Sequence, residues 1–370
     1  MKKIVLFFIL MLLFALPVSA NEEVYSEQLE KSGAVNLQNA LPDETKSLME
    51  NFGIYGVEDI SQELLTPQNI FKHIFSFLKS GAKAPAKTGI TALVLIILFG
   101  AFSGFKREGE VFDTVELVLT VAVALSVIVP LFYVIQSVSE ALKGASVFLF
   151  SFIPVFGVII TATGAVVTGS AAMATLMFAA QCVSAFASFG VVPLSSAYLS
   201  LSCCSAVSGL NVAGDIGQTV KKAAMWILSL VLTIFSGVLA LQTTLAGTGD
   251  TLAIRTGKFV IGTLVPVVGG TLSEALSTLC GSAEVLKGSV AVYGIVALCL
   301  AVLPVVVELL LYRFWVFVCS FAAGVFSQQK TKTVLTAVDG VLSILTNILL
   351  LTSVTFVICL IIITKAVGGK

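Results

Sequence analysis

Long apolar stretches separated by short polar breaks fill the sequence from residue 88 onward. Five of them are long enough to cross a hydrocarbon core of about 30 Å, since a helix rises about 1.5 Å per residue. A backbone inside lipid must satisfy its own hydrogen bonds, so such a stretch folds as a helix. The chain is therefore predicted to be an all-α, polytopic membrane protein. The five stretches cover residues 88–105, 115–135, 223–245, 289–311 and 334–364.

Charge is too scarce to cover the surface of a soluble chain of this length. Charged residues make up 11% of the sequence and hydrophobic residues 57%, whereas about a quarter of a soluble protein is charged. The net charge is zero, which gives no attraction to nucleic acid. The one histidine, His73, lies in the polar N-terminal part, which excludes a Ser-His catalytic centre or a histidine-ligated zinc site within the apolar stretches. We expect no enzyme activity and no cofactor.

The first 20 residues have the layout of a secretory signal peptide. Lys2 and Lys3 supply positive charge, residues 4–16 are apolar, and small residues ending at Ala20 form a cleavage site. The alternative is an uncleaved anchor helix. Both interpretations place Asn21 on the outer face of the membrane.

Residues 21–87 are predicted to be an extracytoplasmic polar segment that precedes the membrane domain, residues 88–370. Pro42 and Gly53 are placed to begin and end one helix. Thr66 and Pro67 begin a second, amphipathic helix that runs to Gly81, just before the membrane. This juxtamembrane helix either lies in the lipid interface or packs on protein.

Two apolar stretches, residues 145–209 and 259–280, contain proline and many small residues. Pro154 and Gly157 lie in the first, and Pro266, Gly269 and Gly270 lie in the second. Proline removes a backbone donor and interrupts a helix, so both segments are predicted to be broken or re-entrant. Together with the regular spans they predict six to eight membrane segments.

An internal repeat is suggested by the two proline motifs. Pro154-Val155-Phe156-Gly157 recurs 112 residues later as Pro266-Val267-Val268-Gly269, and the preceding spans also match. The predicted copies are residues 113–222 and 225–334, which would form a parallel repeat. Lys and Arg clusters at 106–107, 221–222 and 330–332 are expected on the cytoplasmic face, which orients both copies in the same way.

Charged side chains within the apolar stretches are the candidates for function, because burying a charge costs free energy. Glu274 lies beside Ser273 and Ser277 in a segment rich in glycine. This group predicts a polar path between helices or a subunit contact. The alternative is an inter-helix contact with a purely structural role.

Three further charges lie near the ends of later spans. Glu308 and Arg313 flank the end of one span and are interpreted as a structural pair. Asp339 enters the last span.

The block that contains Glu274 resembles the signature of the stage III sporulation protein AE family. The similar residues are Leu-Ala-Ile-Arg-Thr-Gly-Lys-Phe at 252–259 and Pro-Val-Val-Gly-Gly-Thr-Leu-Ser-Glu-Ala at 266–275, continuing to Leu286-Lys287. The order of signal peptide, polar segment and apolar spans is also similar. Arg255 and Lys258 fall in this block and join Glu274 as candidates for the polar path or subunit contact.

The resemblance implies a role in an endospore-forming bacterium. The chain would sit in the mother-cell membrane around the forespore, as a non-enzymatic subunit of the channel or secretion-like complex joining the two cells. A place in the wall of the conduit is one option. The implied partners are the other stage III sporulation A-operon proteins, including a cytoplasmic ATPase and periplasmic ring proteins, and stage II sporulation protein Q, besides the lipid bilayer and a second copy of the chain. The alternatives are a stand-alone secondary transporter of a small solute and a membrane scaffold that anchors ring proteins.

Overall fold

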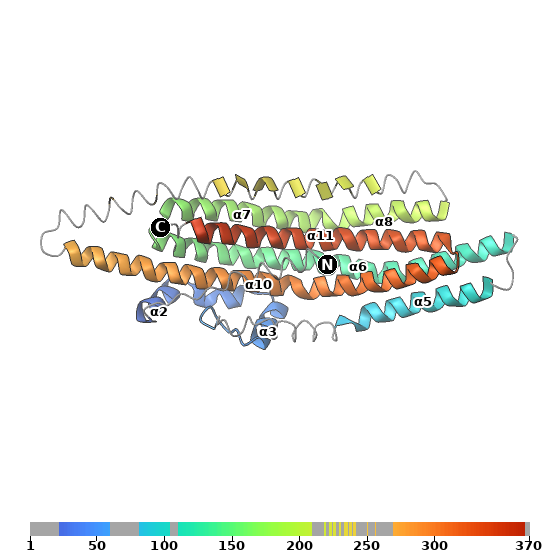
Figure 1. Cartoon of the computed structure of the whole chain (residues 1–370), viewed down its shortest axis with the longest axis horizontal. Helices are drawn as coiled ribbons and strands as arrows, with labels where there is room; N and C mark the ends of the chain where they lie inside the picture. Colours follow the sequence, from blue (N-terminus) through green and yellow to red (C-terminus); the bar gives the residue numbers. More distant parts are fainter. Residues whose placement is uncertain are drawn as a thin grey trace.

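The computed structural model describes residues 22–59, 81–103, 110–208 and 269–366, together with isolated residues between 218 and 256. Helix is the only regular secondary structure in these residues, which confirms the all-α prediction. Six helices run along one long axis, two of them one after the other (Figure 1). They are α5 (Lys83–Ser103), α6 (Glu110–Ala162), α7 (Val166–Phe189), α8 (Val191–Ser208), α10 (Gly269–Val325) and α11 (Gln329–Ala366).

Helices α6 and α10 are far longer than a single membrane crossing requires. They hold 53 and 57 residues. At about 1.5 Å per residue they extend over about 80 and 85 Å, against a hydrocarbon core of about 30 Å. Within the described residues, five helices (α5, α6, α7, α10 and α11) are long and apolar enough to cross a membrane. The prediction of a multi-spanning membrane protein is confirmed.

Two clusters of buried side chains divide the bundle into two halves, which follow one another along its long axis. The cluster that includes Ile96, Leu131 and Leu345 defines the α5 half, which comprises α5, α8 and residues 115–142, 302–325 and 329–350. The cluster that includes Phe152 and Leu360 defines the α7 half, which comprises α7 and residues 145–162, 269–301 and 351–366. Residues 302–307 of α10 contribute to both clusters. Residues 22–59 also belong to the α7 half.

Residues 22–59 form three short helices that pack on the α7 half (Figure 1). These are α2 (Glu22–Lys31), η1 (Ala34–Ala40) and α3 (Asp43–Asn51). The helix predicted between Pro42 and Gly53 is confirmed as α3, with Gly53 in the left-handed region at φ 74° just after it. Leu37 and Met49 are buried in the same cluster as Phe152 and Leu360. The signal peptide and the predicted juxtamembrane helix lie outside the described residues.

The helix break predicted at Pro154 and Gly157 is wrong. Helix α6 continues through both residues to Ala162, and the chain turns at residues 163–165, where Gly164 has φ 91°. Proline removes one backbone hydrogen bond, and the helix is held by Phe152 and its neighbours, which are buried in the core of the α7 half. Gly157 instead leaves room for a neighbouring helix, because a Cβ at this position would collide with Met173 of α7.

The rest of the 145–209 stretch is also more regular than predicted, since it forms the end of α6, then α7 and α8. Pro193 lies in the first turn of α8, where a missing backbone donor costs no intrahelical bond. In the second motif, Gly269 and Gly270 are the first residues of α10, and Pro266 lies outside the described residues.

Helix boundaries differ between the two copies of the predicted repeat. With the 112-residue offset, the turn at 163–165 falls on residues 275–277 and Gly190 falls on Val302, both inside α10. The corresponding stretches α7–α8 and α10 do run in the same direction along the bundle (Figure 1). The repeat stays a prediction.

Candidate functional site

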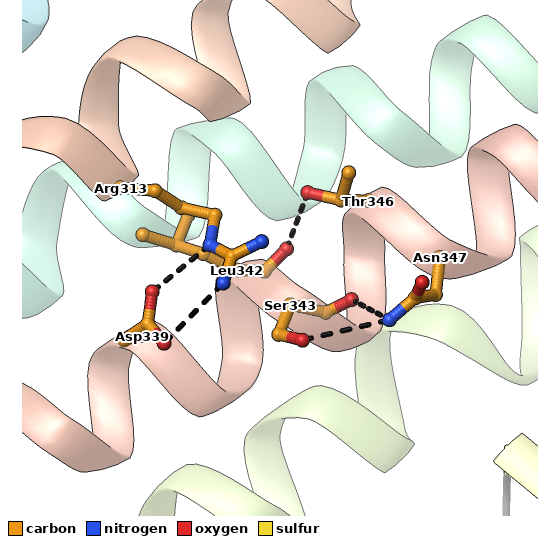
Figure 2. Close-up of polar contacts among 6 residues, drawn as sticks. All are labelled: Arg313, Asp339, Leu342, Ser343, Thr346 and Asn347. Carbon is orange, nitrogen blue, oxygen red and sulfur yellow. Dashed lines mark hydrogen bonds and ion pairs between the residues drawn. The ribbon is translucent and has the colours of Figure 1, made fainter. Parts of the chain in front are cut away.

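An ion pair joins α10 to α11 within the α5 half. The Nε atom of Arg313 donates to Oδ1 of Asp339 at 2.9 Å, and its Nη2 atom donates to Oδ2 at 3.5 Å (Figure 2). The two side chains keep 35% and 43% of their surface exposed. The sequence interpretation that paired Arg313 with Glu308 is wrong. Residues five apart on one helix point to different faces, since only spacings of three or four bring side chains together.

The ion pair forms part of a groove between α10 and α11. The groove encloses about 500 Å³. Its apolar walls include Leu310, Phe314 and Phe317, and the rings of both phenylalanines are exposed. The result is a polar spot in an otherwise apolar surface of the bundle.

A row of polar residues continues along α11 beyond the ion pair. Thr346 donates to the carbonyl oxygen of Leu342 at 2.7 Å (Figure 2). Asn347 donates to the carbonyl oxygen of Ser343 at 2.8 Å and lies 3.5 Å from its hydroxyl. These side chains bond back to their own helix, so their polarity is satisfied locally. The ion pair remains the only inter-helix contact in this close-up.

A larger cavity of about 690 Å³ lies where the two halves meet. Its lining includes Asp43 and Glu44 from α3, Lys83 from α5, Glu140 from α6 and Glu308 from α10. Carboxylates outnumber the single ammonium group, so the cavity is acidic and attracts water and cations. Across the described part of the chain, no three acidic, histidine or cysteine side chains converge as metal ligands.

Two polar contacts join distant segments of the chain in the α7 half. Asp250 is 4% exposed and accepts hydrogen bonds from the backbone N–H groups of Val167 and Thr168, at 2.9 and 2.8 Å. A carboxylate at a helix N-terminus satisfies free donors and complements the helix dipole. Gln28 of α2 donates to the carbonyl oxygen of Leu279 in α10 at 3.1 Å. The sequence analysis missed both contacts, because each joins residues far apart in the chain.

Lys287 belongs to the block that carried the family resemblance, and it is buried in the α7 half at 2% exposure. Its neighbour Glu284, one turn earlier, is exposed. Among the described residues, the Nζ atom of Lys287 has no hydrogen-bond partner. Lys287 is therefore part of the core, whereas Glu284 lies at the surface.

The residues predicted to form a polar path are only partly described. Ser273, Glu274 and Ser277 belong to the first turns of α10, with spacings that put them on neighbouring faces of the helix. Nothing is described of their side chains, and Arg255 and Lys258 lie outside the described residues. The polar path stays a prediction.

Comparisons with known proteins agree with one another. A model of the stage III sporulation protein AE family matches residues 48–367. The chain is 25% identical, over 307 residues, to the stage III sporulation protein AE of Bacillus subtilis (strain 168), covering 81% of this chain and 73% of that protein. No solved structure matches the chain.

Proposed function

The chain belongs to the stage III sporulation protein AE family, and we propose that it is a non-enzymatic membrane subunit of the channel or secretion-like complex between mother cell and forespore. It acts as a multi-pass protein of the mother-cell membrane around the forespore, with its N-terminal segment outside the cytoplasm. Beyond family membership, the observation that carries the proposal is a helical bundle much longer than one membrane.

The α5 half has the dimensions of a single membrane layer. Helix α5 has 21 residues and α8 has 18, which correspond to about 31 and 27 Å. Large apolar side chains on the outer surface of this half are exposed, among them Val118, Leu125 and Val129 of α6. Lipid solvates such side chains well, so we assign the α5 half to the membrane.

The α7 half then projects beyond the membrane on the outer side, together with α2, η1 and α3. Its surface also exposes large apolar side chains, including Val158, Val167 and Phe178. Outside lipid, exposed apolar surface favours contact with another protein. A subunit of an assembly needs such a surface, whereas a stand-alone transporter of a small solute does not. The implied partners are the other A-operon proteins, including the ATPase and the ring proteins, and stage II sporulation protein Q.

Purification of a tagged chain from sporulating cells tests the proposal. The operon-encoded partners should be recovered with it after cross-linking. Phe178→Asp should reduce this recovery at an unchanged level of the chain, because it places a charge in the contact surface. Ser170→Asp is the matched control, since Ser170 is exposed on the same helix without a large apolar side chain. Recovery of the wild-type chain without any of these partners would contradict the proposal.

The predicted polar path is tested separately through Glu274. Glu274→Leu removes charge and hydrogen bonding, and Glu274→Gln removes only the charge. A role in a conduit predicts failed spore formation with the Leu variant and a graded defect with the Gln variant, both at normal protein level. Full sporulation by a stable Glu274→Leu chain would leave complex membership intact and favour a scaffold. Solute transport by the chain reconstituted alone would favour the transporter instead.

A further inference from the structure

We propose that the groove around Arg313 and Asp339 is the contact site for a second copy of this chain, with the two copies related by a twofold axis. The proposal concerns the α5 half and does not depend on membership in the sporulation complex. It rests on the ion pair, on the apolar surface next to it and on the depth of both in the bundle.

The ion pair needs a polar partner on its open side. Arg313 and Asp339 are only half-buried and lie inside candidate membrane spans of α10 and α11. Charged groups in a membrane span nearly always face other protein or water, because lipid cannot hydrogen-bond them. Among the described residues that line this groove, the remaining side chains are mostly apolar. The open side of the pair therefore calls for a polar group from outside the groove.

The depth of the ion pair in the membrane excludes a lipid headgroup as its polar partner. Asp339 lies ten residues after the start of α11, and Arg313 lies twelve residues before the end of α10. At about 1.5 Å per residue these positions are about 15 and 18 Å from the α10–α11 turn, or about halfway through a hydrocarbon core of about 30 Å. Headgroups stay at the surface of that core. Because apolar side chains line most of the groove, another protein segment at the same depth suits it better than water.

The pair is complementary to itself. A guanidinium group has five N–H donors and a carboxylate has about four acceptor positions. Arg313 uses two donors on Asp339, so both groups keep hydrogen-bonding capacity on the open side of the groove. A twofold axis along the membrane normal brings the same site of a second copy to the same depth, so that each Arg313 meets the Asp339 of the other copy. No other chain is needed to satisfy the charges.

The surface of α10 beside the groove suits a helix–helix contact. Phe314, Phe317, Phe321 and Val325 are each exposed by more than half and repeat at spacings of three and four residues. This spacing is that of a seam between packed helices. Ser320 and Gly324 add a pair of small residues four positions apart, which lets helices approach closely in a membrane. The aromatic seam and the ion pair thus form one continuous surface.

Cysteine cross-linking in native membranes tests the contact. Phe317→Cys would be introduced into a cysteine-free chain that still supports spore formation, and then oxidised. Disulfide-linked dimers should form at several times the level seen with Val129→Cys, an exposed control in the same half of the bundle. Equal cross-linking at both positions, or a Phe317→Cys cross-link to a different protein, would overturn the proposal.

Charge reversal tests whether the dimers depend on the ion pair or form only because the chains are crowded in the membrane. On the Phe317→Cys background, Arg313→Asp chains carry two carboxylates at the site and Asp339→Arg chains carry two guanidinium groups. Each variant alone should lose dimers by repulsion, and co-expression of the two should restore dimers that contain one of each. Restored mixed dimers also show that both variants fold. Unchanged self-dimers of either variant, or no mixed dimers when both chains reach the membrane, would count against a twofold contact through this pair.

Discussion

Each half of the bundle has a buried apolar cluster, and the two halves differ in the contacts that accompany it. In the α5 half, buried polar side chains of the α10–α11 turn and of α11 contact other helices. Gln328 donates to the carbonyl oxygen of Ile96 at 2.9 Å, and the hydroxyls of Thr120 and Thr331 lie 3.1 Å apart. Helices in lipid gain little hydrophobic free energy by touching, so hydrogen bonds and close packing must hold them. The α5 half has the contacts expected of helices assembled in lipid.

In the α7 half, the buried cluster contains aromatic rings and side chains of the N-terminal segment. Phe148, Phe152 and Phe156 form a ladder along α6, with ring centroids 5.5 and 5.3 Å apart. Leu37 and Met49 of the N-terminal segment bury themselves in the same cluster. Such burial stabilises a fold chiefly when the surrounding solvent is water. The comparison therefore supports one half in the membrane and the other outside it, and the predictions below test that division.

The largest expected difference between the halves is in access to water. In vegetative cells that make a cysteine-free version of the chain alone, Phe178→Cys should react with an impermeant thiol reagent added from outside. Val129→Cys should remain unlabelled, because a thiol in lipid does not form the reactive thiolate. Both side chains are exposed on the bundle, by 68% and 53%. Absence of labelling at both positions would place the α7 half in lipid as well.

The next largest effect is expected when a buried side chain in the N-terminal segment is truncated. Met49 is fully buried, so Met49→Ala is expected to cost about 2–5 kcal/mol through lost burial and a cavity. Val35→Ala, at an exposed site in the same segment, should cost little. Thermal unfolding of the purified chain in detergent measures both. Equal losses for the two variants would mean that the segment does not pack on the α7 half as described.

The sequence was sufficient to predict the helical membrane class, but it was less informative about where helices end and what they contact. The apolar run from residue 88 predicted α5, which begins five residues earlier at Lys83 because Pro85 is tolerated in a first turn. The helix break predicted at Pro154 does not form, because tertiary packing outweighs local propensity. Arg313 and Asp339 were both recognised as unusual charges. Their pairing depends on the register of two helices, which no local pattern encodes.

Crowding at a helix contact should have a smaller effect than loss of the N-terminal packing. A side chain at Gly294 of α10 would collide with the ring of Phe152, whereas Gly288, on the same helix, has open space around it. Gly294→Leu should therefore lower the free energy of unfolding by about 1–3 kcal/mol, as overpacking does. Gly288→Leu should be neutral or slightly stabilising, because leucine favours helix over glycine. Unfolding in detergent measures both variants, and a larger loss at Gly288 would contradict the described packing of α6 on α10.

The smallest effect is expected for the hydrogen bond between Thr120 and Thr331, and it offers the finest test of the comparison. Both hydroxyls are buried between α6 and α11 in the α5 half. Thr→Val keeps the shape and removes the hydroxyl, so the two single variants and the double variant form a cycle that isolates the contact. Hydrogen bonds between membrane helices contribute only about 0.6 kcal/mol on average, because the separated helices also find polar partners. We expect a coupling free energy below about 1 kcal/mol when the four chains are unfolded in the same detergent. A coupling several times larger would mean that the contact contributes as much as a hydrogen bond in a water-excluded soluble core. The α5 half would then pack in the same way as the α7 half, and the division between them would lose its energetic basis.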